Sequence, residues 1–226
     1  MEAHAHRPAD NVRPSVGTLV PPDTSGPATY HCDMSSRDER FVTVVSGLPR
    51  SGTSMMMMMV EAGGMSVLTD QVRGPDEDNP KGYYEFEPVK ATRSDPSWVQ
   101  GAAGKAVKIV HILLFELPPT NRYRVILMRR DLAEVLASQA AMLRRGGRSG
   151  ADLSPQRLGE IFEAQLQRVV QWADREENVD LLEVSYADVL RRPLEEAARV
   201  NEHLGAALDV DAMAAAVDPK LHRQRS

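Results

Sequence analysis

Residues 41–62 contain a short apolar run, a turn with two glycines and an apolar helix, in that order. Phe41 to Ser46 (FVTVVS) is a β-branched run, which is typical of a buried strand. Met55 to Ala62 consists of good helix formers and is followed by two glycines, which predicts a helix and its end. A buried strand followed at once by a helix favours a parallel sheet covered by helices.

The rest of the chain repeats this alternation. Further strands are predicted at 106–110, 124–128 and 180–184. Helices are predicted from a capping box at Asp131 and Glu134 to about Arg145, from a cap pair at Ser154 and Pro155 onward, and over 193–204. The predicted fold class is therefore α/β: a three-layer, mostly parallel sheet with helices on both faces.

Residues 1–39 differ in composition from the rest. Five prolines lie there among Thr, Ser, Gly and His, and neither a helix period nor a strand period is present. We expect a disordered tail, followed by one α/β domain over 40–226. An alternative is that synthesis begins at Met34, just before the first strand. The segment lacks the apolar h-region of a secretory signal, so we expect none.

Charge and cysteine content exclude several classes of function. Lys and Arg total 27 against 32 Asp and Glu, which gives a net charge of −5. A net acidic chain is a poor candidate for nucleic-acid binding, although it can still hold a local basic pocket for a small anion. Cys32 stands alone, so an internal disulfide is impossible. The longest apolar runs are far shorter than the roughly 20 residues of a membrane span. We expect a cytoplasmic protein.

The turn after the first strand predicts an anion-binding site. Gly47 to Ser54 (GLPRSGTS) has the spacing of a phosphate loop, except that Thr53 stands where that loop has lysine. Backbone N–H groups of such a turn and of the following helix N-terminus converge on one point. Gly52 permits close approach of a ligand to the backbone, and Arg50 replaces the missing cation. Hydroxyl donors are added by Ser51, Thr53 and Ser54. The alternative is a structural turn with chance glycine spacing.

Two stretches of the sequence resemble a known family. Pro49 to Ser54 (PRSGTS) resembles the 5′-phosphosulfate loop of sulfotransferases that use 3′-phosphoadenosine 5′-phosphosulfate (PAPS). The second signature of that family is a strand that ends in Arg, with Ser eight residues later on the next helix. Here Arg130 and Ser138 have that spacing, and the two signatures occur in the family's order. The resemblance extends from about Phe41 to Leu204.

The resemblance implies how the donor binds. The loop from Pro49 to Ser54 would hold the 5′-phosphosulfate, and Arg130 with Ser138 would hold the 3′-phosphate. The spacing agrees, because a guanidinium at a strand end and a hydroxyl two helical turns later can face one phosphate. Tyr186 matches a position where related enzymes place an aromatic near the adenine. Each of the three residues has a structural alternative: a strand-end charge, a helix-face serine and a packed aromatic.

The same resemblance suggests residues for the chemistry. Lys108, within a predicted strand, lies where related enzymes have a lysine on the transferring sulfuryl group. His111 lies near their histidine base, but the spacing differs, and in a regular strand positions 108 and 111 face opposite sides. Glu85 ends a stretch, Asn79 to Glu85, that is similar to the N-P-x-G-[YF]-x-E segment of small bacterial relatives. Glu85 is preferred to Glu87 as a candidate base, with a solvated surface acid as the alternative.

The expected activity is transfer of the sulfuryl group from PAPS to a hydroxyl or amine, leaving 3′,5′-ADP. A small molecule or a glycan is the expected acceptor, no metal is required, and nothing in the sequence sets the oligomeric state. Two alternatives are a relative that binds 3′,5′-ADP without catalysis and a phosphate-loop kinase.

Three further expectations concern residues outside the motifs. Arg129 points away from the site, the Met55–Met59 run packs the loop against the sheet, and Arg223 and Arg225 belong to a frayed end.

Overall fold

The computed structural model describes residues 41–70, 84–145, 147 and 153–218. All of them belong to one compact unit that spans residues 34–226. The expected tail over 1–39 and the C-terminal arginines lie outside the described residues, as does most of the Asn79 to Glu85 stretch.

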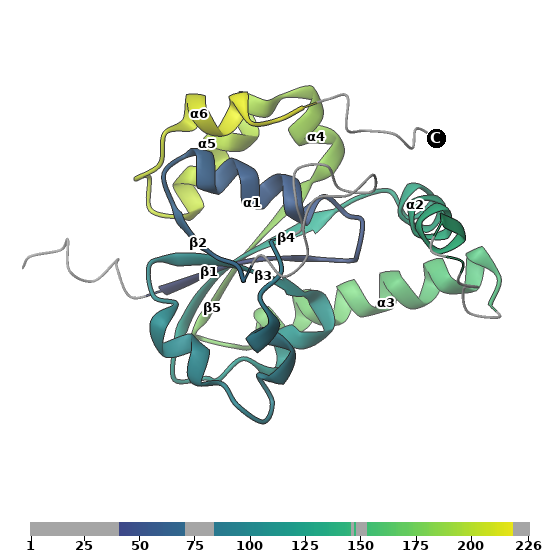
Figure 1. The fold of residues 1–226 in the computed structure, drawn as a ribbon, viewed down its shortest axis with the longest axis horizontal. Coiled ribbons are helices and arrows are strands. Elements are labelled where there is room, and N and C mark those ends of the chain that lie inside the picture. The colour runs from purple at the N-terminus through teal and green to yellow at the C-terminus, as the bar shows by residue number, and fades with distance from the viewer. Residues whose placement is uncertain (1–40, 71–83, 146, 148–152, 219–226) are drawn as a thin grey trace, which may run out of the picture. The chain divides into compact units, whose positions relative to one another are not determined.

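The described ranges form a five-stranded sheet in the order β2-β3-β1-β4-β5, and every neighbouring pair is parallel (Figure 1). The strands are β1 (Phe41–Gly47), β2 (Ser66–Leu68), β3 (Lys105–Val110), β4 (Arg122–Arg129) and β5 (Val179–Ser185). The predicted α/β class is confirmed. The edge strand β2 was not predicted, because three residues are too few to show a period of two.

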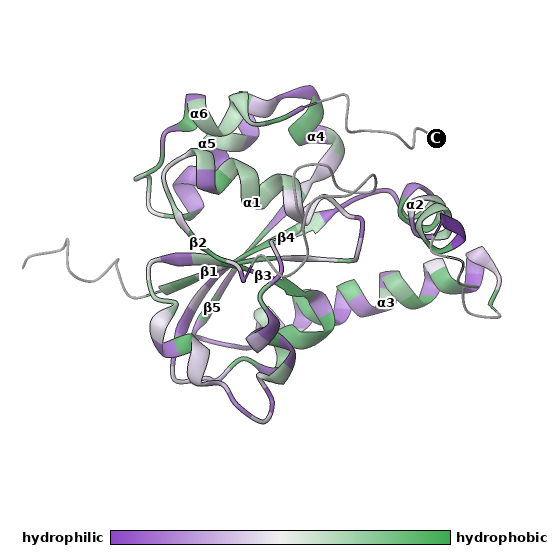
Figure 2. Cartoon of the chain, viewed as in Figure 1, coloured by the Kyte–Doolittle hydropathy of each residue, from purple (hydrophilic) through white to green (hydrophobic). Residues whose placement is uncertain are grey.

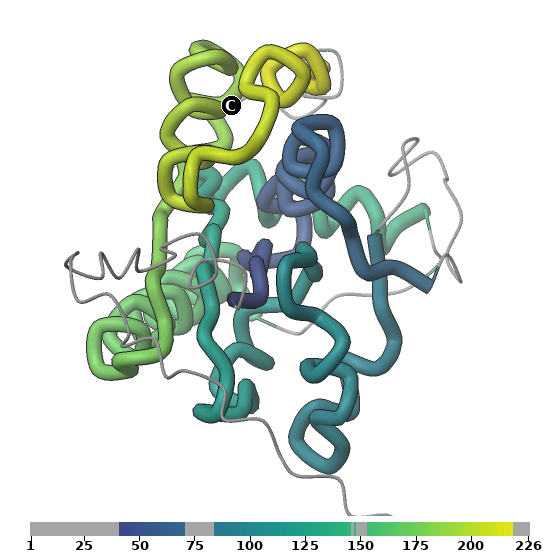
Figure 3. Tube along the Cα trace, turned by 90° about the vertical axis from the view of Figure 1, so that its left-hand side faces the viewer, coloured from purple at the N-terminus to yellow at the C-terminus, as the bar shows by residue number. Residues whose placement is uncertain are grey.

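Helices cover both faces of the sheet. They are α1 (Thr53–Ala62), α2 (Leu132–Arg145), α3 (Pro155–Ala173), α4 (Tyr186–Arg191), α5 (Pro193–His203) and α6 (Val210–Ala215). Three 3₁₀ helices are η3 (Glu87–Ala91), η4 (Ser97–Gly101) and η5 (His111–Glu116). Helices α1, α4, α5 and α6 lie on one face, and α3 with η5 lies on the other (Figure 1). Figure 3 shows α6 alongside α1, where the Asp209 N–H donates to the Gly63 carbonyl over 3.0 Å.

The predicted helix starts are confirmed by their caps. The Asp131 carboxylate accepts a hydrogen bond from the Glu134 N–H over 3.0 Å, just before the first turn of α2. The Ser154 hydroxyl accepts one from the Arg157 N–H over 3.2 Å, and Pro155 is the first residue of α3. These bonds satisfy backbone donors that a helix start leaves without partners. The caps therefore fix where each helix begins relative to the strand before it.

The methionine run of α1 is core, as predicted. Met55, Met56, Met57 and Met59 are buried and pack with strand residues of β1, β3 and β4. Figure 2 shows α1 as largely hydrophobic, whereas α3 alternates hydrophobic and hydrophilic residues along its length. An apolar helix packed on the sheet holds its own N-terminus at the carboxyl end of β1. This packing fixes the turn between β1 and α1, from which the candidate site is built.

Among the residues that the structure describes, the helices are too short or too polar to span a membrane.

Candidate functional site

The turn between β1 and α1 has an unusual backbone. Arg50 has a φ of 76° and Gly52 a φ of 101°, so both residues are left-handed. The Ser51 N–H donates to the Leu48 carbonyl over 3.1 Å, and the Gly52 carbonyl accepts the Met56 N–H over 3.1 Å at the start of α1. Left-handed geometry is uncommon for a residue other than glycine and is concentrated at ligand sites. The turn therefore has the local character that an anion loop needs.

Gly52 meets a tight steric requirement. A Cβ added there would lie 2.5 Å from Cδ2 of Tyr186, so the loop and the aromatic ring approach each other too closely for any side chain. Gly64, at the end of α1, has nearly the same φ of 100° but open space around it.

We expect Gly52→Ala to lower the free energy of unfolding by about 1–2 kcal/mol for the left-handed backbone, and by about 1–3 kcal/mol more for the clash. Gly64→Ala is the matched control, and it should lower the free energy of unfolding by the backbone contribution alone. Urea unfolding of both variants makes the comparison. Equal losses would show that Tyr186 does not confine the loop.

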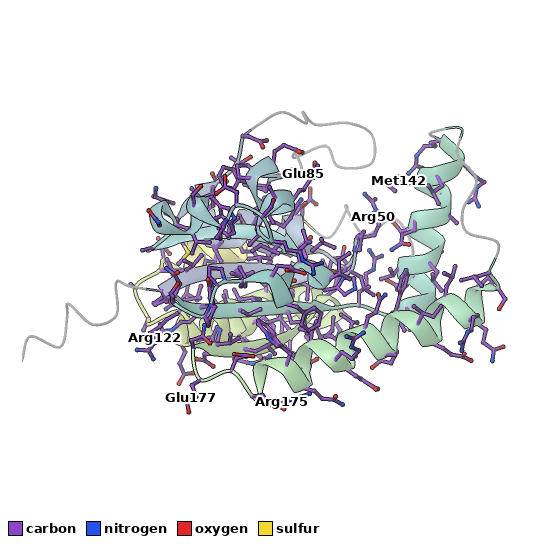
Figure 4. The ribbon with its side chains drawn as sticks, turned by 90° about the horizontal axis from the view of Figure 1, so that it is seen from below. Arg50, Glu85, Arg122, Met142, Arg175 and Glu177 are labelled. Carbon is purple, nitrogen blue, oxygen red and sulfur yellow. The ribbon has the colours of Figure 1, made fainter. Side chains whose placement is uncertain are left out.

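Arg50, Arg130 and Ser138 lie in one cluster. The Nε of Arg50 donates to the Ser138 hydroxyl over 3.0 Å, and Nη1 of Arg130 donates to the Arg50 carbonyl over 3.1 Å. In Figure 4, Arg50 lies at the end of the sheet that faces α2, the helix of Met142. The two predicted cation positions, from different strand-to-helix junctions, therefore meet at the carboxyl ends of β1 and β4. In parallel α/β sheets this edge is the usual place for ligands.

The Arg130 guanidinium is enclosed by three groups. Its Nε donates to the Glu134 carboxylate over 2.8 Å, its Nη1 contacts the Arg50 carbonyl, and its carbon lies 4.5 Å from the ring centre of Tyr186. Burial raises the pKa of the Tyr186 phenol above its ordinary value, against the opposing effect of the nearby Arg130 charge. Tyr186 thus lies beside the loop, stacked on the guanidinium. Its contact with adenine stays a prediction.

The Ser51 hydroxyl is buried in the loop. The residue is only 1% exposed, and its Oγ has no hydrogen-bond partner among the described residues. A Cβ on Gly47 would lie 2.4 Å from this oxygen, so the hydroxyl fits against the bare glycine. Buried polar atoms without partners are rare, and an anion bound in the loop could satisfy this one. Thr53 and Ser54 are the first two residues of α1.

Two residues that hold this arrangement were not predicted from the sequence as part of the site. The Gln139 amide donates to the Pro49 carbonyl over 2.9 Å, which ties α2 to the loop. Glu134 was recognised only for its place in the capping box, yet its side chain pairs with Arg130. The available signals were spacing: Glu134 lies four residues after Arg130, and Gln139 follows Ser138 directly. Spacing alone does not show which partner a helix residue will meet across the fold.

Lys108 is half-buried in β3, an internal strand between β2 and β1. It pairs in register with Val45 of β1, and so lies on the sheet face that α1 covers. This position is two residues before Val110, which pairs with Gly47 at the start of the loop. The lysine therefore lies in the interior of the sheet, on the face that α1 covers.

His111 faces the other way. It is buried at the start of η5, and its Nε2 lies 2.9 Å from Oε1 of Gln165 on α3. Helix α3 covers the sheet face opposite α1, so the structure does not bring His111 together with Lys108. The strand alternation predicted this divergence.

Glu85 is described, but the turn before it is not. Its carbonyl accepts hydrogen bonds from the Asp70 N–H and the Thr69 hydroxyl, both over 3.1 Å, which fixes the backbone where Figure 4 labels Glu85.

Arg129 lies on the α3 side of the sheet. Its guanidinium pairs with Glu163 over 3.0 Å and with Glu183 over 3.3 Å. The prediction that Arg129 points away from the site is confirmed.

Among the described residues, no group of three or more His, Cys, Asp or Glu side chains could hold a metal ion. Glu134, the acid beside the loop, is the partner of Arg130.

Comparison with known proteins adds only distant likenesses. No family model matches the chain, and no curated protein matches it. A sulfotransferase from Alicyclobacillus acidocaldarius is similar at 15% identity and a TM-score of 0.46, over 80% of this chain and 88% of that one. The sulfotransferase domain of the curacin biosynthetic pathway has 12% identity and a TM-score of 0.44, over 80% and 89%. A sugar kinase from Janibacter sp. HTCC2649 has 13% and 0.37, over 75% and 99%. At these values none of the three bears on the activity of this chain.

Proposed function

We propose that this protein is a PAPS-dependent sulfotransferase. The observation that supports the proposal most strongly is the contact between the two predicted anion sites: Arg50 bonds Ser138, and Arg130 bonds the Arg50 backbone. A donor with phosphate groups on both the 5′ and the 3′ oxygen of its ribose needs two adjacent anion sites. ATP, which has no 3′-phosphate, would use only one of them.

The donor would be held by groups of two kinds. The loop from Pro49 to Ser54 offers backbone N–H groups at the start of α1 and the buried hydroxyl of Ser51 for the 5′-phosphosulfate. Arg130 and Ser138 would bind the 3′-phosphate through charge-assisted hydrogen bonds. Ser138 is buried, so its bonds are little weakened by water.

In the proposed reaction an acceptor oxygen or nitrogen attacks the sulfur in line. The bond from sulfur to the bridging oxygen breaks, and 3′,5′-ADP leaves with that electron pair. Arg50 and Lys108 would stabilise the charge that develops on the transferring group and the leaving oxygen. Because a sulfuryl group carries less negative charge than a phosphoryl group, these cations suffice and no metal is required. The acceptor is proposed to be a small molecule or a glycan hydroxyl, and the compartment the cytoplasm.

The acceptor must lose a proton, and we assign its removal to Glu85. Glu85 follows Tyr84, whose hydroxyl donates to the Glu61 carboxylate near the C-terminal end of α1. The Glu85 carbonyl is bonded to Thr69 and Asp70, just after the carboxyl end of β2. His111 is the other candidate base, but its Nε2 is engaged by Gln165 on the opposite face.

Isothermal calorimetry with 3′,5′-ADP and with ATP, each with and without Mg²⁺, tests the nucleotide assignment. We expect binding of 3′,5′-ADP without magnesium and much weaker binding of ATP. Preference for Mg-ATP would instead favour a kinase. A screen for transfer of ³⁵S from labelled PAPS then separates an enzyme from a relative that only binds 3′,5′-ADP.

A further inference from the structure

Arg130 and Glu134 form an ion pair that is largely removed from solvent. Their side chains are 9% and 12% exposed, and Nε of Arg130 lies 2.8 Å from Oε2 of Glu134. Most other ion pairs close in sequence are far more open; in Arg157–Glu160 the side chains are 63% and 51% exposed. Charges interact strongly in such a shielded place, because water screens them little. The Glu134 carboxylate is therefore a strong influence on whatever else Arg130 binds.

Glu134 contributes to the start of α2 through its backbone. The hydrogen bond that begins the helix is made by the backbone N–H of Glu134 to the Asp131 carboxylate. The side chain is used on Arg130, which is also stacked on Tyr186 and bonded to the Arg50 carbonyl. Removing the charge of Glu134 therefore leaves the backbone groups of the Asp131 cap bond unchanged.

We propose that Glu134 is the internal counter-ion of Arg130 and sets how strongly the site prefers a nucleotide with a 3′-phosphate. This inference rests on the proposed function. The negative charge of Glu134 offsets part of the attraction between Arg130 and the phosphate, so the 3′-phosphate contributes less to binding than a lone arginine would allow. The consequence is a donor site from which 3′,5′-ADP can leave, because Glu134 remains to neutralise Arg130.

Glu134→Gln tests the counter-ion directly. Glutamine has the same shape and keeps an oxygen that accepts from Nε of Arg130, but it lacks the charge. We expect the variant to bind 3′,5′-ADP about tenfold more tightly, and to bind 5′-AMP, which has no 3′-phosphate, as the wild type does. The preference is the dissociation constant for 5′-AMP divided by that for 3′,5′-ADP, measured by calorimetry on the full chain. This ratio should rise about tenfold. If Glu134 had a purely structural role, the substitution would change the affinities for both nucleotides by the same factor.

Glu163→Gln is the matched control. Glu163 pairs with Arg129, the neighbour of Arg130, but on the side of α3 and away from the loop. This variant should leave both dissociation constants unchanged. Glu134→Ala provides a second test should the glutamine variant not fold, because it also removes the charge. It should raise the ratio as well, by less than glutamine, since it loses the oxygen that orients Arg130.

The outcomes separate the two proposals. If wild-type protein binds 3′,5′-ADP no better than 5′-AMP, the proposed function fails. If the wild type prefers 3′,5′-ADP but a folded Glu134 variant shows an unchanged or smaller ratio, the function stands and the counter-ion role is overturned.

Discussion

Replacing Arg50 with alanine is expected to lower the rate of sulfuryl transfer by about 10²–10³-fold, the usual loss when one electrostatic donor to a transition state is removed. Arg50 lies in the loop assigned to the 5′-phosphosulfate, and its Nε bonds Ser138 at the neighbouring site. The measurement is the rate of ³⁵S release from labelled PAPS with an acceptor from the screen. Normal turnover would remove Arg50 from the mechanism.

Arg50→Gly distinguishes loss of the cation from damage to the loop. The φ of Arg50 is 76°, a conformation that glycine adopts without strain, so the glycine variant should be more stable than the alanine variant by about 1 kcal/mol. Both should lose turnover equally. Arg129→Ala controls for loss of one positive charge and should stay near wild-type turnover, because that guanidinium pairs with Glu163 and Glu183. Recovery of activity in Arg50→Gly would mean that the loop backbone matters and the cation does not.

Replacing Arg130 with alanine is expected to weaken binding of 3′,5′-ADP by about 10²-fold, since charge-assisted hydrogen bonds contribute roughly 1.5–3 kcal/mol each. Binding of 5′-AMP should change less, because that nucleotide has no 3′-phosphate for Arg130 to bind. Calorimetry with the two nucleotides measures both. An equal loss of affinity for both nucleotides would show that Arg130 maintains the fold and does not bind the 3′-phosphate.

The single substitution leaves Glu134 as a shielded charge without its partner, which is itself destabilising. The double variant Arg130→Ala with Glu134→Gln avoids this and should show the same weak binding of 3′,5′-ADP. The four proteins also form a double-mutant cycle. If Glu134 acts through Arg130, Glu134→Gln tightens 3′,5′-ADP binding only where Arg130 is present. The same gain in both backgrounds would contradict the ion-pair account.

Much of the sheet was predictable because its signals are local. The strand at Phe41–Gly47 is rich in β-branched residues, and the caps at Asp131 and Ser154 lie within three residues of the donors they bind. Such features depend on nearby residues only. Helices α4 and α6 were missed because six residues give less than two turns, too few to show an amphipathic period.

The site was predictable in its anion-binding residues and not in their partners. A phosphate-loop spacing and an arginine at a strand end are sequence patterns, so Arg50, Arg130 and Ser138 could be named in advance. That Arg130 would lie on Tyr186, and that Gln139 would bond the Pro49 carbonyl, depends on how three separate junctions pack. Contacts of this kind are set by tertiary structure, and a single sequence does not encode them in any fixed spacing.

The residues assigned to proton transfer show the same limit. Strand alternation was enough to place Lys108 and His111 on opposite faces, and the Gln165 contact agrees. Choosing Glu85 required a motif resemblance, because the acid follows a turn whose geometry no period describes.

A crystal structure of the full chain with 3′,5′-ADP is the most direct examination of the whole account. It should show the 5′-phosphate on the backbone N–H groups between Pro49 and Ser54, with the other phosphate bonded to Arg130 and Ser138. A nucleotide bound elsewhere, or one whose 3′-phosphate extends into solvent away from Arg130, would contradict it.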